Sequence, residues 1–151
     1  MSQHIINCNI LSLSILLGTL LLAIGLFTAH SKTKIIAVLL LLLSSISTVV
    51  IFYLGKVNLD LGWQQLEASE TLVHFHQKNI EFLLVTAVLL GIISSVNLIL
   101  YFKKSKFIKV AYVATLLISL VVSVESYLVV KSGHEIMATD KSPSTQVIEI
   151  D

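Results

Sequence analysis

The densest group of ionisable side chains lies between positions 70 and 81, in the stretch ETLVHFHQKNIE. Imidazole nitrogens of His74 and His76 could ligate a haem or a transition metal, with Glu81 as a neighbouring proton partner. On a helix, His74, Lys78 and Glu81 share one face, whereas His76 points about 200° away from His74. One helix therefore cannot bring both histidines to one metal ion, and the HExxH pattern of zinc proteases is absent.

A second group lies at the end of the last apolar stretch. Glu125 falls inside that stretch, where an ionised carboxylate is costly unless it is paired or close to water. It could bind a proton or a ligand, or simply reach the headgroups. Gly133 predicts a helix end, with His134 and Glu135 just outside the membrane. The candidate ligands for a haem or metal are thus His76, His134, His74, Glu81 and Glu125. The alternative is that these residues are only hydrated side chains at the membrane surface.

The elements that position these residues follow from composition. Of 151 residues, 56% are hydrophobic and only 13% are charged, whereas a soluble domain averages about 25% charged residues. This composition indicates an integral membrane protein surrounded by the lipid bilayer. A net charge of +1 argues against a nucleic-acid partner, because phosphate binding needs a basic face. Cys8 is the single cysteine, which excludes an internal disulfide and a cysteine-based metal cluster.

Four stretches have the roughly 20 apolar residues that a membrane helix needs. They are residues 10–29, 35–54, 80–102 and 107–130. We predict an all-α fold, an integral membrane four-helix bundle made of two transmembrane hairpins. Residues 1–137 would form one domain, with a link at 55–79 that can be helical from Trp63 onward, and 138–151 would form a flexible polar tail.

Lysines predict the orientation of the bundle. Six of them lie in or beside the two short turns, at Lys32, Lys34, Lys103, Lys104, Lys106 and Lys109. The positive-inside rule places both turns in the cytoplasm, so both termini and the link would be periplasmic in a bacterial inner membrane. The first span is not expected to be a cleaved signal peptide, because its leader has no lysine or arginine.

Small residues repeat along the predicted helices at the spacing of one helix face. Gly18 and Gly25 lie on one face of the first span, and Gly91 lies between Ala87 and Ser95 in the third. Small side chains let membrane helices approach closely, so these residues predict packing seams in a compact bundle. A pore lined by hydroxyl groups is the alternative.

Two segments resemble a family of bacterial four-helix inner-membrane proteins of unknown function. YLGKVNLDLGWQQLEASETLVHFHQKNIEFLL is similar to the region where the family's third helix opens, with His76 in the signature position. SYLVVKSGHEIM is similar to the end of its fourth helix, through Gly133, His134, Glu135 and Ile136. The resemblance implies a haem or electron-transfer context, but Gln77 replaces the usual acidic residue and only one glycine of a pair is present.

Sequence motifs for enzymes are absent: the chain has no GxSxG, no Walker loop and no paired cysteines. We therefore predict a non-enzymatic membrane protein, a structural or accessory subunit that binds other membrane or periplasmic proteins through its link and tail. The tail's QVIEI could add a strand to a partner. The alternatives are a haem- or metal-binding protein using His76 and His134, and a small proton-coupled transporter using Glu125.

Overall fold

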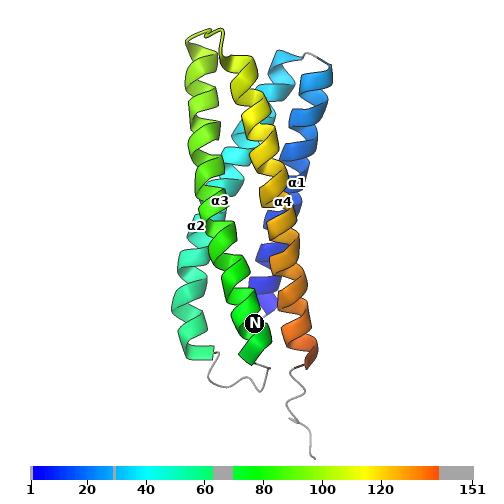
Figure 1. The fold of residues 1–151 in the computed structure, drawn as a ribbon, viewed down its shortest axis with the longest axis vertical. Coiled ribbons are helices and arrows are strands. Elements are labelled where there is room, and N and C mark those ends of the chain that lie inside the picture. Colours follow the sequence, from blue (N-terminus) through cyan, green and yellow to red (C-terminus); the bar gives the residue numbers. More distant parts are fainter. Residues whose placement is uncertain (1, 29, 63–69, 140–151) are drawn as a thin grey trace, which may run out of the picture.

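A computed structural model describes residues 2–28, 30–62 and 70–139, with side chains described at 9–28, 30–53, 71–72 and 74–136. These residues form α1 (Ser2–Phe27), α2 (Ser31–Gly62), α3 (Glu70–Phe102) and α4 (Ile108–Thr139). The predicted all-α bundle of two hairpins is confirmed (Figure 1). In a bilayer a helix satisfies its own backbone hydrogen bonds, which is why long apolar stretches take this form.

The four helices pack in a ring in which each contacts its neighbours in the chain, and α1 closes the ring against α4. The short connections α1–α2 and α3–α4 lie at the same end of the bundle, which we call the turn end (Figure 1). At the other end α1 and α3 begin and α2 and α4 finish, and we call this the histidine end. The topology thus brings the start of α3 next to the end of α4.

The helices extend beyond the predicted spans at the histidine end. α2 continues to Gly62 and α3 begins at Glu70, so most of the predicted link is helical. The remainder, 63–69, which includes Trp63, lies outside the described residues. Likewise 140–151, most of the predicted tail and all of QVIEI, lies outside the described part of the chain.

The prediction that Gly133 ends the last helix is wrong. α4 passes through Gly133 without a break and ends at Thr139. Its last turns stay packed in the bundle, because Ser132 and Ile136 are each 2% exposed. Contact with α3 thus outweighs the tendency of a lone glycine to end a helix.

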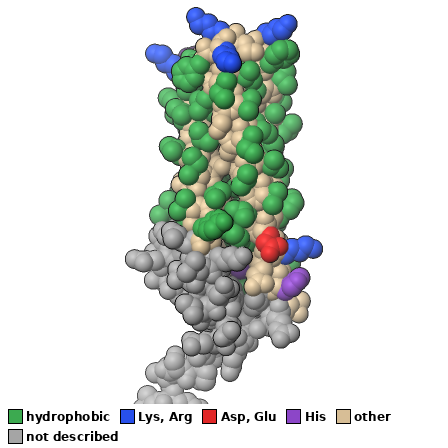
Figure 2. Space-filling model, turned by 90° about the vertical axis from the view of Figure 1, so that its left-hand side faces the viewer, with side chains coloured by type: hydrophobic (Ala, Val, Ile, Leu, Met, Phe, Trp, Pro, Cys, Tyr) green, Lys and Arg blue, Asp and Glu red, His purple; other side chains and the backbone are tan. Residues whose placement is uncertain are grey.

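Each helix contains a segment long and apolar enough to cross a bilayer: Asn9–Phe27, Ser31–Tyr53, His74–Phe102 and Ile108–Ile136. Their large apolar side chains, such as Leu13, Leu43 and Leu117, point outward, and green side chains cover the outer face (Figure 2). The interior combines buried apolar residues such as Leu22 and Leu90 with many buried serines and threonines. This arrangement suits a multi-pass membrane protein, whose surrounding lipid is as apolar as leucine.

Glycines allow close contact of α1 with α2 and of α2 with α3. A Cβ atom on Gly18 would lie 2.9 Å from the side chain of Leu41. A Cβ on Gly91 would lie 2.5 Å from Ser45 Oγ, which donates a hydrogen bond to the carbonyl of Ala87 at 2.7 Å. The small side chains of these helices therefore lie at helix contacts.

Gly25 has the same role at the turn end of the α1–α2 contact. A Cβ atom there would lie 3.1 Å from the backbone nitrogen of Lys34. A Cβ at this position would be tighter than an ordinary contact, so Lys34 would have to shift by a few tenths of an ångström.

Polar side chains join α4 to the helices on either side of it. Ser12 of α1 pairs with Ser126 through hydroxyl oxygens 3.1 Å apart. Asn97 of α3 is 1% exposed, and its Nδ2 donates to the carbonyl of Ala111 at 3.0 Å and to the hydroxyl of Thr115. Such bonds are worth about 0.6 to 2 kcal/mol in a membrane, because lipid offers these groups no partner.

The α3–α4 connection is a tight turn with a lysine in an unusual conformation. The N–H of Ser105 donates to the carbonyl of Leu100, and that of Lys104 to the carbonyl of Tyr101, both at 3.0 Å. This is a Schellman motif, whose left-handed residue is usually glycine. Here it is Lys104, with φ of 51°. A left-handed conformation costs a residue with a Cβ roughly 1–2 kcal/mol.

Candidate functional site at the histidine end

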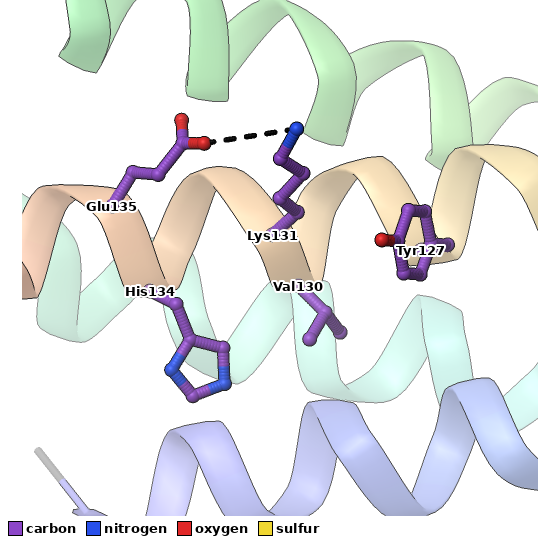
Figure 3. A pocket seen from close by; sticks show the side chains of 5 residues that line it. All are labelled: Tyr127, Val130, Lys131, His134 and Glu135. Carbon is purple, nitrogen blue, oxygen red and sulfur yellow. Dashed lines mark ion pairs between the residues drawn. The ribbon is translucent and has the colours of Figure 1, made fainter.

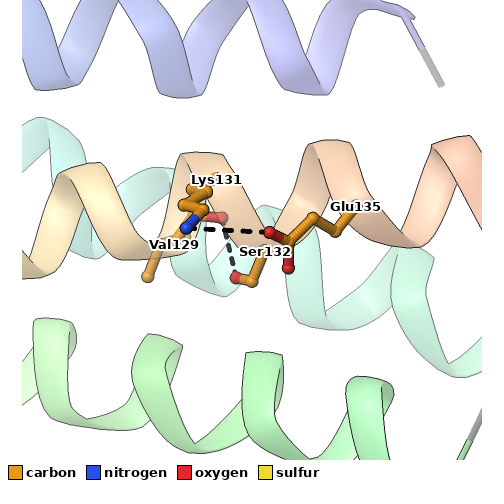
Figure 4. A network of polar contacts seen from close by, with 4 residues as sticks. All are labelled: Val129, Lys131, Ser132 and Glu135. Atoms are coloured by element: carbon orange, nitrogen blue, oxygen red, sulfur yellow. Dashed lines mark hydrogen bonds and ion pairs between the residues drawn. The ribbon is translucent and has the colours of Figure 1, made fainter.

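His76 is part of the contact between α3 and α4. Its side chain is 7% exposed, and its Nδ1 lies 2.7 Å from the hydroxyl oxygen of Ser132. Ser132 also donates to the carbonyl of Val129 at 3.1 Å, a contact drawn in Figure 4. Because a hydroxyl has one hydrogen, this geometry favours His76 as the donor to Ser132. The ring also lies beside Gly133, where a Cβ would meet His76 Cε1 at an ordinary contact distance of 3.5 Å.

Three further ionisable residues near the start of α3 face away from the bundle. His74, Lys78 and Glu81 are all exposed, whereas His76 is buried. The predicted separation of the two histidines onto different faces of one helix is confirmed.

His134 lies on an exposed surface of α4. A shallow pocket of about 420 Å³ is lined by Tyr127, Val130, Lys131, His134 and Glu135. We call the surface formed by these five residues the α4 face. In Figure 3, Lys131 and Glu135 lie on the side of α4 toward α3, and His134 on the side toward α1. Lys131 Nζ and Glu135 Oε1 form an ion pair at 3.8 Å.

We expected His76 and His134 to ligate a haem or metal together. The structure instead places His76 in the contact between α3 and α4 and His134 on the exposed α4 face. His76 packs against Ser132 and Gly133, while the pocket beside His134 does not include His76. Among the residues that the structure describes, no three histidine, cysteine, aspartate or glutamate side chains form a group that could hold a metal ion. The described geometry therefore gives no support to a metal centre.

Glu125 is half-buried on α4 and does not line the pocket. Its side chain has no hydrogen-bond or ion-pair partner within the described part of the chain. Its neighbours are exposed Val124 and buried Ser126, so it lies at the edge of the α4 contact with α1. This position suits a carboxylate that extends toward the lipid headgroups.

Several residues of this region were missed in the sequence. The sequence predicts a span that ends at residue 130 and a helix end at Gly133, so it does not single out Tyr127, Val130 and Lys131 as parts of one surface with His134. Once α4 continues, the spacing i, i+3, i+4, i+7 and i+8 from Tyr127 shows that one face includes all five pocket residues. That spacing was the available signal.

Comparison of the chain with protein-family models, with curated proteins and with solved structures gives no match. The family resemblance of the two segments therefore stays a prediction.

Proposed function

We propose that this protein is a non-enzymatic accessory protein of the membrane that binds a partner protein along the α4 face. The observation that carries the proposal is the continuity of that face. Five residues at helical spacing give an exposed surface with an aromatic ring, an aliphatic floor, a base, an acid and an imidazole. A partner helix or strand can dock on such a face by apolar contact bordered by charge pairing.

The side chains of the α4 face have the properties of an interface centre and its rim. Tyr127 is 63% exposed, and tyrosine is enriched at the energetic centres of protein interfaces. Lys131 and Glu135 are 59% and 51% exposed, so charges on a partner can approach both side chains. A partner segment with one apolar side chain between an acidic and a basic residue fits this pattern.

The orientation of the bundle is also part of the proposal. The six lysines of the turn end support a cytoplasmic location for that end. The α4 face would then lie at the periplasmic surface of a bacterial inner membrane, together with both termini. There it could act with the predicted link 55–79 and the predicted tail 138–151 in holding a partner.

Photocrosslinking in cells tests the proposal. A benzophenone amino acid replacing Tyr127 should give a discrete protein adduct, whereas the same group replacing Tyr53 should not. Tyr53 is a matched control, because it is a 72% exposed tyrosine on α2 at the same end of the bundle. The paired exchange Lys131→Glu with Glu135→Lys keeps an ion pair but reverses its polarity, so it should remove the Tyr127 adduct.

Two results would contradict this function. One is the same set of adducts from Tyr127 and Tyr53, which would mean non-specific collision in the bilayer. The other is a Tyr127 adduct that persists unchanged in the charge-exchanged variant, which would mean that the face does not select its partner by charge.

A further inference from the structure

The turn end carries a dense positive charge with no acidic residue near it. Lys32, Lys103, Lys104, Lys106 and Lys109 are exposed, and Lys34 is half-buried. No aspartate or glutamate occurs between residues 11 and 59 or between 82 and 124, the segments that flank the two turns. Among the described residues, the ion pair between Lys131 and Glu135 lies at the histidine end, opposite these lysines. Figure 2 shows the lysine side chains gathered at the turn end and directed away from the apolar body.

Aromatic side chains place these lysines at the level of the lipid headgroups. Phe27, Phe102 and Phe107 are 91%, 77% and 60% exposed at the same end, and exposed aromatic rings at the ends of membrane spans are typical of the membrane–water interface. Lys106 Nζ lies 5.5 Å from the centre of the Phe107 ring. A lysine held beside an exposed aromatic ring at the end of a span has its amine at the membrane–water boundary.

Lys104 indicates that charge matters here more than backbone preference. It occupies the left-handed position of the Schellman motif, at φ of 51°, where glycine would be more stable. Lysine at this position adds a third positive charge to the turn, beside Lys103 and Lys106. Glycine would allow a less strained backbone but would remove this charge. The turn therefore favours cation density over local stability.

We propose that the turn end binds the phosphate groups of anionic phospholipids, chiefly through Lys103, Lys104 and Lys106, with Lys32 from the other turn. Charge complementarity and depth both point to lipid as the source of the phosphate. The exposed phenylalanines put the amines in the headgroup layer, where lipid phosphates are concentrated. Lysine is a point charge that suits a mobile headgroup, unlike the fixed bidentate geometry of arginine. The proposal concerns the opposite end from the α4 face and does not depend on it.

Spin-labelled lipids measure this selectivity directly. The full chain is reconstituted in phosphatidylcholine, and the motionally restricted fraction is compared for spin-labelled phosphatidylglycerol and spin-labelled phosphatidylcholine. We expect a relative association constant of about 3 or more at low salt, falling toward 1 at 0.5 M NaCl as the charges are screened. A ratio near 1 at low salt would overturn the proposal.

Lys104→Gly separates charge from folding. It should lower the selectivity by about twofold or more while leaving the melting temperature equal or higher, because glycine suits the left-handed position. The triple change Lys103→Gln, Lys104→Gly and Lys106→Gln should bring the ratio close to that of a neutral lipid. Lys78→Gln removes an exposed lysine from the histidine end and should leave the ratio unchanged.

Three outcomes of these variants count against the proposal. Equal loss in Lys78→Gln would mean that only total charge matters. Unchanged selectivity in the triple variant would remove these lysines from the site. Loss of lipid selectivity on adding inorganic phosphate, beyond that from NaCl at equal ionic strength, would mean that free phosphate rather than lipid is the ligand.

Discussion

The buried contacts between helices and the exposed α4 face both use polar side chains, but in opposite ways. Inside the bundle, most hydroxyl groups donate to a carbonyl of their own helix, and a few polar side chains reach a neighbouring helix, as Ser45 does to Ala87 and His76 to Ser132. On the α4 face, Lys131 and Glu135 contact each other and remain more than half exposed. The first set builds the bundle, while the second is available to something outside it.

This difference follows from the solvent of each region. Lipid cannot accept or donate a hydrogen bond, so a polar group inside the bundle must find its partner within the protein. Lys131 and Glu135 lie in the last turns of α4 and are exposed, and charged side chains near the end of a span can extend toward headgroups and water. Most of the polar residues of the spans are therefore structural, and functional hypotheses belong at the ends of the bundle.

The largest effect is expected where a helix contact leaves no space. In Gly91→Ala the new Cβ would lie 2.5 Å from Ser45 Oγ and displace that hydroxyl from its bond to Ala87. We expect a loss of about 1–3 kcal/mol in the free energy of unfolding, from overpacking and the lost hydrogen bond. Denaturation by SDS, followed by circular dichroism, measures it.

Gly133→Ala is the matched control, because its Cβ would meet His76 Cε1 at an ordinary 3.5 Å. Alanine is a better helix former than glycine, so this variant should be as stable as the parent or more stable. Adding Ser45→Ala to Gly91→Ala should recover part of the loss. Unchanged stability of the Gly91→Ala protein would contradict the conclusion that polar groups at the helix contacts stabilise the bundle whereas those of the α4 face do not.

A smaller effect should divide the two histidines that the sequence paired. His76→Ala removes a buried ring and its bond to Ser132, and we expect a loss of about 2 kcal/mol. His134→Ala changes an exposed side chain and should shift stability by no more than about 0.5 kcal/mol. The same SDS titration compares them, and equal losses would contradict the assignment of His76 to the bundle and His134 to the surface.

Sequence periodicity predicted the fold well because lipid imposes a simple rule: long apolar stretches become helices, and short lysine-rich turns join them. The same logic predicted that His76 leaves the face of His74, since helical spacing fixes direction. It could not predict what His76 would meet, because Ser132 is 56 positions away and only packing of α3 on α4 brings the two together.

The end of α4 was the main error in the sequence-based interpretation. Local preference indicates a stop at Gly133, but the contact of His76 with this stretch holds the helix together through it. Burial of Ile136 beyond the glycine stabilises the extra turns in the same way. The α4 face depends on this continuation, since His134 and Glu135 fall in line with Tyr127 only on an unbroken helix.

The smallest effect is expected at the ion pair of the α4 face. Lys131 precedes Glu135 by four residues, the less favourable order on a helix, and both side chains are more than half exposed. A double-mutant cycle with Lys131→Met and Glu135→Gln should therefore give a coupling energy of at most about 0.5 kcal/mol, and less in 0.5 M NaCl. Such weak coupling would mean that the Lys131–Glu135 contact itself adds little to the stability of α4. A coupling above about 1 kcal/mol would instead assign the pair to the architecture of α4 and remove the charge pairing on which partner selection depends.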